Sequence, residues 1–253
     1  MKCVEVRGVK IGEGIPKIIV PIVGTTEKEI LESADALNGI SMDLVEWRAD
    51  YFDGVYDFAK VKSVLKELRK ELGSIPILFT FRTAGEGGEK DITADAYALL
   101  NIMAAQSGLV DLIDVEAFIG DEIVSRIIEE AHRAGVLVVA SNHDFTATPA
   151  KDEIVSRLRR MQELGADIPK IAVMPCGSED VLTLLAATQE MAAKYADRPI
   201  ITMSMSGTGL ISRLCGEVFG SACTFGAVGR TSAPGQIGVK DLDSVLKLIH
   251  ANL

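Results

Sequence analysis

The feature that most limits the fold of this chain is a regular alternation of short apolar segments with longer amphipathic ones. From Lys17 onward, eight segments typical of buried strands are each followed by a segment with helical periodicity. This alternation with short loops predicts a parallel sheet with right-handed crossovers. Eight units in 253 residues fit a (β/α)8 TIM barrel, because a doubly wound sheet usually has fewer strands. No Gly-, Ser- or Pro-rich linker interrupts the series, so we expect residues 1–253 to form one α/β barrel domain.

The residues ahead of the first unit follow a different pattern. The segments VEVRG and VKIG, which together span residues 4–12, have the length and composition of two short strands joined by a turn. We expect this N-terminal β-hairpin to close the floor of the barrel.

Composition and charge exclude several classes of function. Hydrophobic residues make up 48% of the chain, which predicts a large core and argues against disorder. The net charge of -10 and the pI of about 4.9 argue against a nucleic-acid or membrane partner, so an anionic substrate would need local arginines. The sequence has no signal-peptide core and no membrane-spanning apolar run, which favours the cytoplasm. Four cysteines without a C-x-x-C pair or a nearby His cluster indicate free thiols and no metal site.

A lysine interrupts the sixth apolar segment, ADIPKIAVMP, which spans residues 166–175. Lysine is almost never buried without a partner, because the removal of an ammonium from water is costly. Lys170 shares a face with Ala172, and the small alanine leaves room for a substrate beside the amine. A lysine in the middle of a strand either extends its amine toward water or takes part in chemistry, and we favour chemistry.

Further polar side chains gather where the predicted strands end, which is the edge that carries the active site in barrels of this kind. Structural alternatives exist for several of them. Glu46 and Arg48 could form only an ion pair, and His143 could be a satisfied polar group, whereas His132 and His250 lie on helices and are expected at the surface. Met203 and Met205 could serve packing alone or form the apolar wall of a pocket. The full set at this edge is Glu46, Arg48, Arg82, Glu86, Asp114, Glu116, His143, Met203, Met205, Arg213, Ser232 and Gln236.

A buried lysine and a nearby histidine suit one type of chemistry. An unprotonated amine attacks a ketone to form an imine, and burial together with the cations Arg48, Arg82 and Arg213 would favour the unprotonated form. The protonated imine withdraws electrons and acidifies the adjacent C–H, so a base can form an enamine that expels a leaving group. His143 has a suitable ordinary pKa to take and return that proton, and Glu86 could hold its ring in one tautomer.

Seven motifs in order make the sequence resemble the type I 3-dehydroquinate dehydratases of the shikimate pathway. They are EWRAD, FTFR…EGGE, SNHDF, DIPKIAVMP, PIITMSM, ISRL…FGS and SAPGQI, and the similarity extends from Lys17 to the last helix. The resemblance implies a homodimeric (β/α)8 barrel without metal or organic cofactor. It implies dehydration of 3-dehydroquinate to 3-dehydroshikimate, a lyase reaction in aromatic amino acid biosynthesis.

The resemblance also implies a role for each matching residue. Lys170 would form the Schiff base, and His143, oriented by Glu86, would be the general acid and base. The substrate hydroxyls would be held by Glu46, Arg48 and Arg82, and the carboxylate by Arg213, Ser232 and Gln236.

Two other functions stay open at this point. A class I aldolase acting on a sugar phosphate would use the same buried lysine, and the Gly-rich segment GAVGRTSAPGQIG could bind its phosphate. A non-catalytic barrel that serves as a binding or regulatory subunit would form no adduct that borohydride can trap.

Overall fold

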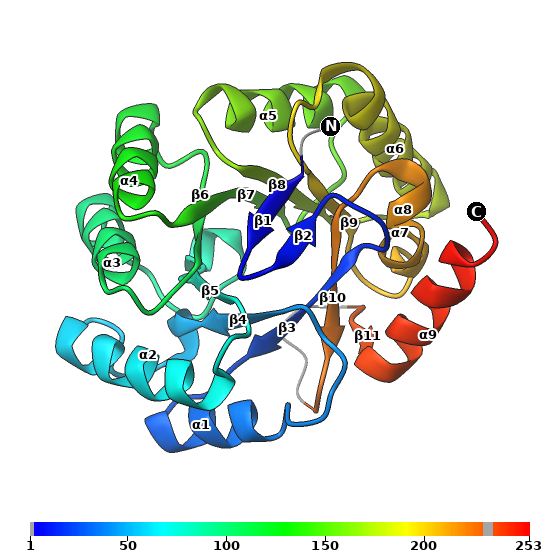
Figure 1. Cartoon of the computed structure of the whole chain (residues 1–253). Helices are drawn as coiled ribbons and strands as arrows, with labels where there is room; N and C mark the ends of the chain where they lie inside the picture. The colour runs from blue at the N-terminus through cyan, green and yellow to red at the C-terminus, as the bar shows by residue number, and fades with distance from the viewer. Residues whose placement is uncertain (1–2, 230–234) are drawn as a thin grey trace.

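A curled parallel sheet forms the centre of the molecule, and helices surround it (Figure 1). The structure is a computed structural model and describes residues 3–229 and 235–253. Within those residues nine strands form one sheet in the order β11-β10-β3-β4-β5-β6-β7-β8-β9, with parallel pairing between neighbours. The strands are β3 (Lys17–Ile22), β4 (Leu44–Arg48), β5 (Ile77–Thr80), β6 (Leu112–Glu116), β7 (Leu137–Asp144), β8 (Ile168–Val173), β9 (Ile201–Ser204), β10 (Cys223–Ala227) and β11 (Ile237–Gly238).

The predicted TIM barrel is confirmed, although its ladder of hydrogen bonds is incomplete at one place. Strands β3 to β10 follow one another around the ring, as the eight βα units predict. Between β9 and β10 an isolated bridge pairs Ile200 with Ser221, and Ala222 N–H donates to the Ile200 carbonyl (2.8 Å). The sheet is therefore a curled, nearly closed cylinder, and the short strand β11 extends its edge beside β10.

The helices follow the strands in the expected order. They are α1 (Glu27–Asp35), α2 (Phe58–Leu72), α3 (Ala94–Gln106), α4 (Asp121–Arg133), α5 (Lys151–Glu163), α6 (Ser178–Glu190), α7 (Leu210–Leu214), α8 (Gly216–Phe219) and α9 (Val239–His250). The amphipathic segment after β9 is split into α7 and α8 at Cys215, next to a glycine, which is a poor residue for a helix interior. No helix in the described part of the chain is long and apolar enough to cross a membrane.

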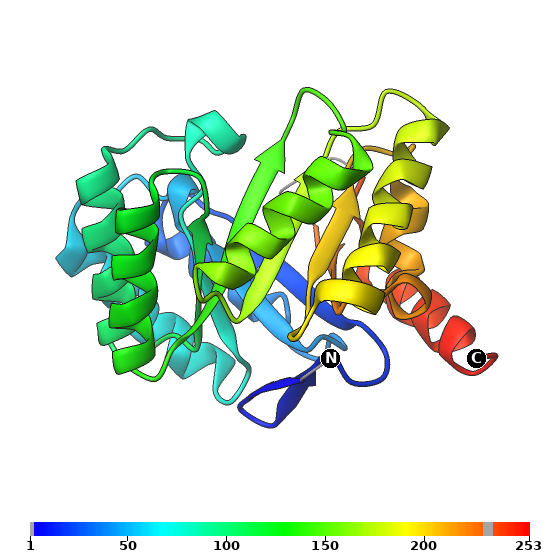
Figure 2. The same cartoon turned by 90° about the horizontal axis from the view of Figure 1, so that it is seen from above.

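The N-terminal hairpin closes the barrel floor, as predicted. Strands β1 (Val4–Val6) and β2 (Val9–Ile11) pair antiparallel, and the hairpin lies across the end of the cylinder (Figures 1 and 2). Ile11 is fully buried and belongs to one apolar cluster with inward side chains of the barrel strands. The cluster members from those strands include Ile19, Leu44, Leu78, Leu112, Val139, Ile168, Ile201 and Cys223.

The side chains inside the cylinder change from apolar to polar along each strand. Side chains two residues apart in a strand point to the same face, so Leu44, Glu46 and Arg48 of β4 all point inward. The same spacing leads from Ile168 to Lys170 on β8. Apolar residues therefore fill the half of the cylinder next to the hairpin, and charged residues fill the half at the carboxyl ends of the strands. That second half is where a barrel of this type carries its chemistry.

Candidate active site

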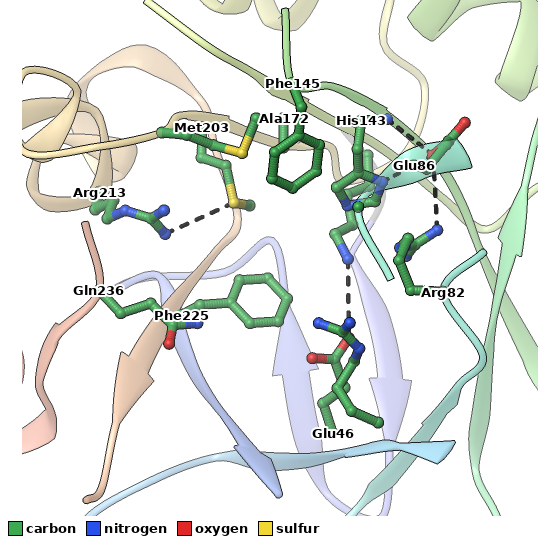
Figure 3. A pocket seen from close by; sticks show the side chains of 14 residues that line it. Glu46, Arg82, Glu86, His143, Phe145, Ala172, Met203, Arg213, Phe225 and Gln236 are labelled. Atoms are coloured by element: carbon green, nitrogen blue, oxygen red, sulfur yellow. Dashed lines mark hydrogen bonds and ion pairs between the residues drawn. The ribbon is translucent and has the colours of Figure 1, made fainter. Parts of the chain in front are cut away.

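A pocket at the carboxyl ends of the strands is lined by most of the residues predicted for this edge (Figure 3). It encloses about 510 Å³ of space that is open to solvent at its mouth. Figure 3 shows Arg213, Met203 and Gln236 on the side of the pocket opposite His143, Glu86 and Arg82. The lining residues are Glu46, Arg48, Arg82, Glu86, Gly87, His143, Phe145, Lys170, Ala172, Met203, Met205, Arg213, Phe225 and Gln236.

Lys170 projects from the middle of β8 into this pocket and is only 3% exposed. Its Nζ lies 3.0 Å from Asp114 Oδ2 and 3.9 Å from Glu46 Oε1. The ammonium also lies over the ring of Phe225, 4.8 Å from its centroid. Among the described residues the charged groups within ion-pair distance of the amine are carboxylates, while Arg48, Arg82 and Arg213 line the same pocket, as expected, without contacting it.

Asp114 links Lys170 to Arg82 at the centre of the barrel. Its Oδ1 accepts from Arg82 Nη2 (2.7 Å) and from Ser141 Oγ (2.6 Å). Burial raises the pKa of Asp114, but the charges of Arg82 and Lys170 outweigh burial and hold that pKa well below its usual range. Asp114 is therefore a carboxylate that holds the lysine in place, and it is a weak base.

Arg82 is itself held by several acceptors. Besides Asp114, its Nη1 donates to Glu116 Oε1 (3.0 Å) and to Ser141 Oγ (3.0 Å). Glu116 in turn accepts from the Thr83 backbone N–H (2.8 Å). The guanidinium is buried and fixed at the wall of the pocket, where it adds positive charge.

His143 is paired with Glu86 through two contacts. Glu86 Oε2 accepts from the His143 backbone N–H (2.9 Å) and lies 2.9 Å from the ring nitrogen Nδ1. A carboxylate can only accept, so Nδ1 carries the proton in this pair and Nε2 is left as the basic nitrogen. Glu86 and His143 therefore lie as the expected pairing requires, and the role of Glu86 in orienting the ring stays a prediction.

The pKa values of His143 and Glu86 are shifted in opposite directions. Burial lowers the pKa of His143 well below its usual range, and the charges of Arg82 and Lys170 add to that effect. Burial raises the pKa of Glu86 to about 7, although Arg82, at 3.7 Å, opposes the increase. His143 is therefore neutral at physiological pH and can act as a base, while Glu86 titrates close to neutrality.

Glu46 and Arg48 of β4 both face the pocket but have further partners. Arg48 donates to Asp50 through both Nε and Nη2, each at 2.8 Å. Glu46 accepts from the hydroxyl of Thr80 on β5 (2.9 Å). The bidentate contact with Asp50 fixes the orientation of the guanidinium at the rim of the pocket.

Among the described residues, the opposite wall combines the cation Arg213 with apolar and amide groups. Arg213 on α7 is 2% exposed, and its Nη1 lies 3.7 Å from the sulfur of Met203. Burial lowers the pKa of Arg213 to about 10, which leaves the guanidinium charged at neutral pH. Met205 and Gln236 line the pocket beside it, whereas Ser232 lies outside the described residues.

Several residues that contact the site residues were not assigned a role from the sequence. Asp114 was visible as an inward residue, because it lies two positions after Leu112, but its partner Lys170 is 56 positions away. The sequence around Asp50 does not predict its contact with Arg48, and the sequence around Phe225 does not predict its contact with Lys170. Within residues 3–229 and 235–253, no three His, Cys, Asp or Glu side chains are grouped so that they could hold a metal ion.

Comparisons with known proteins identify the family of this chain. The family model described as type I 3-dehydroquinase matches residues 18–253. A 3-dehydroquinate dehydratase of Clostridioides difficile (strain 630) is 58% identical over 250 residues, which are 99% of this chain and 98% of that protein. The corresponding protein of Salmonella agona is 56% identical and covers 99% of both chains.

Solved structures agree with this assignment. The crystal structure of type I 3-dehydroquinate dehydratase from Clostridium difficile with covalently modified comenic acid has a TM-score of 0.97 and 57% identity. The alignment includes 100% of this chain and 99% of the C. difficile chain. The 3-dehydroquinate dehydratase of Geobacillus kaustophilus gives a TM-score of 0.96 at 39% identity, with coverage of 99% and 97%. This chain belongs to the type I 3-dehydroquinase family.

Proposed function

We propose that this enzyme, a hydro-lyase by its family, dehydrates 3-dehydroquinate to 3-dehydroshikimate through an imine formed on Lys170. The observation that carries the proposal is the position of the amine. Lys170 lies on a rigid strand, is buried in a pocket with His143, and is held by the carboxylate of Asp114. Such a pocket can hold a covalent intermediate in one orientation.

The first stage forms the imine. The ammonium of Lys170 loses a proton, and the free amine attacks the ring ketone of the substrate. We assign that proton to the Nε2 atom of His143, because Glu86 is paired with the other ring nitrogen and leaves Nε2 free to accept it. His143 returns this proton to the hydroxyl of the addition product, which leaves as one water and gives the protonated imine, so His143 is again a free base.

The second stage eliminates the hydroxyl. His143 removes a proton from the carbon next to the imine, and the electrons of that C–H bond form the enamine. The enamine then expels the hydroxyl of the following carbon as the C–O bond breaks, and His143 returns its proton to the departing oxygen. One water hydrolyses the product imine and restores Lys170, so the net change is the loss of one water.

The two walls of the pocket suit the two polar regions of the substrate. We assign the carboxylate to Arg213 with Gln236 and Ser232, because a guanidinium can bind a carboxylate through two hydrogen bonds. The ring hydroxyls are assigned to Glu46, Arg48 and Arg82 on the opposite wall. Met203 and Met205 cover the apolar part of the ring.

Two points favour this function over the other functions left open by the sequence. The related C. difficile structure contains covalently modified comenic acid, which supports the presence of a reactive side chain in this family. The relatives compared above are named dehydratases, which disfavours a sugar-phosphate aldolase and a non-catalytic barrel.

The remaining proposals concern cofactors, oligomeric state and cellular location. No metal or organic cofactor takes part, because the protonated imine already provides the electron sink. Residues 1–253 act as one domain in a homodimer, which sedimentation at working concentration tests: a monomer mass would contradict it. The free thiols Cys3, Cys176, Cys215 and Cys223 support a reducing cytoplasmic location.

A direct assay tests the proposed reaction. The purified enzyme mixed with 3-dehydroquinate should generate a conjugated enone, which absorbs in the ultraviolet, and exhaustive chelation should leave the rate unchanged. The Lys170→Met variant should be nearly inactive. No absorbance change with the wild-type enzyme, or a loss of activity in EDTA that zinc or magnesium restores, would contradict the proposal.

A further inference from the structure

A chain of hydrogen bonds connects the outer helix α5 with the imidazole of His143. Arg157 Nη1 on α5 donates to Asn142 Oδ1 (3.0 Å). The amide nitrogen of Asn142 donates to Glu86 Oε1 (3.1 Å). The other oxygen of Glu86 contacts His143 Nδ1 (2.9 Å). Neither Arg157 nor Asn142 has a place in the reaction described above.

Neighbouring side chains of β7 point to opposite sides of the barrel wall. Ser141 and His143 point into the cylinder, so the side chain of Asn142 between them leaves on the outer face. That face is covered by α5, where Arg157 meets the amide oxygen. Glu86 belongs to the loop that crosses the end of β7, where it receives the amide nitrogen. Asn142 is 9% exposed and therefore lies within the wall of the barrel.

The chemistry of the two ends fixes the orientation of the amide. A guanidinium has donors only, so the Asn142 oxygen must face Arg157. An ionised carboxylate has acceptors only, so the Asn142 nitrogen must face Glu86. Without Arg157 only the bond to Glu86 would hold the amide, so the Asn142 side chain would be less firmly fixed and its bond to the carboxylate weaker.

Glu86, the carboxylate in this series of hydrogen bonds, is sensitive to the loss of a hydrogen-bond donor. Glu86 faces Arg82 (3.7 Å) and the like-charged Glu116, and burial has already raised its pKa to about 7. The hydrogen bond from Asn142 lowers that pKa and so favours the charged form. His143 is in turn faced by Arg82, Lys170, Asp114 and Arg48. On the outer side, Arg157 is accompanied by Glu153 (2.8 Å) and Asp144 (3.9 Å).

We propose that Asn142 and Arg157 are positioning residues, which hold Glu86 as a carboxylate directed at His143. The proposal rests on the proposed function, in which Glu86 orients the general base. Asn142 acts directly on Glu86, and Arg157 acts only through the orientation of the Asn142 amide. A residue on the outer helix ring thereby controls the pH range over which the base can act.

The pH dependence of kcat tests the role of Asn142. The acidic limb of the profile reports protonation of the Glu86–His143 pair in the enzyme–substrate complex. Asn142→Ala removes a donor to the carboxylate, so the limb should move to higher pH by about 1 unit. KM should change little, because Asn142 does not line the pocket. A profile that overlaps the wild-type curve would overturn the proposal.

A double-mutant cycle tests the role of Arg157. Arg157→Met should move the acidic limb in the same direction by about half as much, and it should add nothing to Asn142→Ala. The control is Arg160→Met on the same helix, because Arg160 pairs with Asp121 and Glu163 and does not touch Asn142. The control should leave the limb in place. If Arg157→Met still shifts the acidic limb when Asn142 is already alanine, then Arg157 acts independently of Asn142. That result would refute the proposal that Arg157 acts through the Asn142 amide.

Borohydride reduction of the wild-type enzyme with 3-dehydroquinate separates the two proposals. Trapping of substrate on Lys170 without a pH shift in the variants would reject the positioning role alone. Absence of any adduct would reject the proposed function, and the positioning role with it. If Asn142→Ala fails to fold, Arg157→Met still decides the question, because Arg157 lies at the outer surface and its replacement leaves the strand unchanged.

Discussion

Asp114 Oδ2 lies 3.0 Å from Lys170 Nζ at the centre of the barrel, where both side chains are almost completely buried. The same carboxylate accepts from Arg82 at 2.7 Å through its other oxygen. One buried anion therefore fixes two cations, the amine that we assign as nucleophile and a guanidinium of the pocket wall. Its loss would leave two buried cations with fewer partners.

The first prediction concerns this cluster. Asp114→Asn should reduce the free energy of unfolding by about 3–5 kcal/mol, because removal of one member of a buried ion pair leaves the other uncompensated. Urea denaturation measures the change. The exposed Asp53 provides the control, and Asp53→Asn should change stability by less than about 0.5 kcal/mol. Addition of Lys170→Met to Asp114→Asn should cost less than the sum of the two single changes, and simple additivity would contradict the proposed coupling.

The second prediction follows from the raised pKa of Glu86. The folded protein binds the Glu86 proton more tightly than the unfolded chain does, because burial raises the pKa from 4.5 to about 7. This contribution to stability is complete below pH 4.5 and is lost as the pH rises through 7. Glu86→Gln removes it, so the stability of the variant relative to the wild type should increase from pH 5 to pH 8 by about 2–3 kcal/mol. Urea unfolding across this range measures the difference, and a constant difference would contradict the assigned shift.

The third prediction concerns the recognition of the substrate carboxylate. Arg213→Ala should weaken substrate binding on the order of 10²-fold, because a buried guanidinium can bind a carboxylate through two charged hydrogen bonds. Arg213→Lys should recover only part of the affinity, since an ammonium cannot bind in this bidentate way. Arg126 is exposed on α4, and Arg126→Ala is the control that should have no effect. Unchanged affinity of Arg213→Ala would remove Arg213 from the site.

The fourth prediction concerns the backbone next to Gln236. Gly235 has φ of +78°, and a Cβ at that position would lie 2.2 Å from the Ser206 carbonyl oxygen. Gly235→Ala should push this segment away from the loop after β9, raise KM through Gln236, and leave the reactivity of Lys170 unchanged. Gly229 has a similar φ of +69° but open space around its Cα. Gly229→Ala therefore controls for backbone strain, and equal KM values in the two variants would contradict the role of the close contact.

The regular parts of the fold were predictable because they depend on local periodicity. Period-two alternation placed Lys170 on one face with Ala172 and Glu46 on one face with Arg48, and helical periodicity identified the surrounding helices. The incomplete ladder between β9 and β10 was not predictable, because apolar strand patterns do not specify which neighbours complete their hydrogen bonds. The break at Cys215 within the helix after β9 was missed because a single glycine rarely decides a helix boundary.

The contacts within the site were less accessible to sequence reasoning. The pair of Lys170 and Asp114 joins β8 and β6, which lie 56 residues apart in the sequence and come together because both pair with β7. Arg157 belongs to the polar face of a surface helix by pattern, yet its side chain reaches Asn142 inside the barrel wall. Identification of the reacting residues was possible because their types are chemically rare inside strands. Their partners are ordinary charged residues and carry no such signal.

The central claim is that Lys170 forms the imine and His143 moves protons. The most direct measurement is borohydride reduction with 3-dehydroquinate, followed by mass spectrometry of the peptides. His143→Ala keeps the amine but should slow proton removal on the order of 10²–10⁴-fold, so reduction should leave substrate-derived mass on the peptide that contains Lys170. Lys170→Met should give no adduct at any position. Substrate-derived mass on Lys17, Lys151 or another lysine, with Lys170 unmodified, would contradict the account.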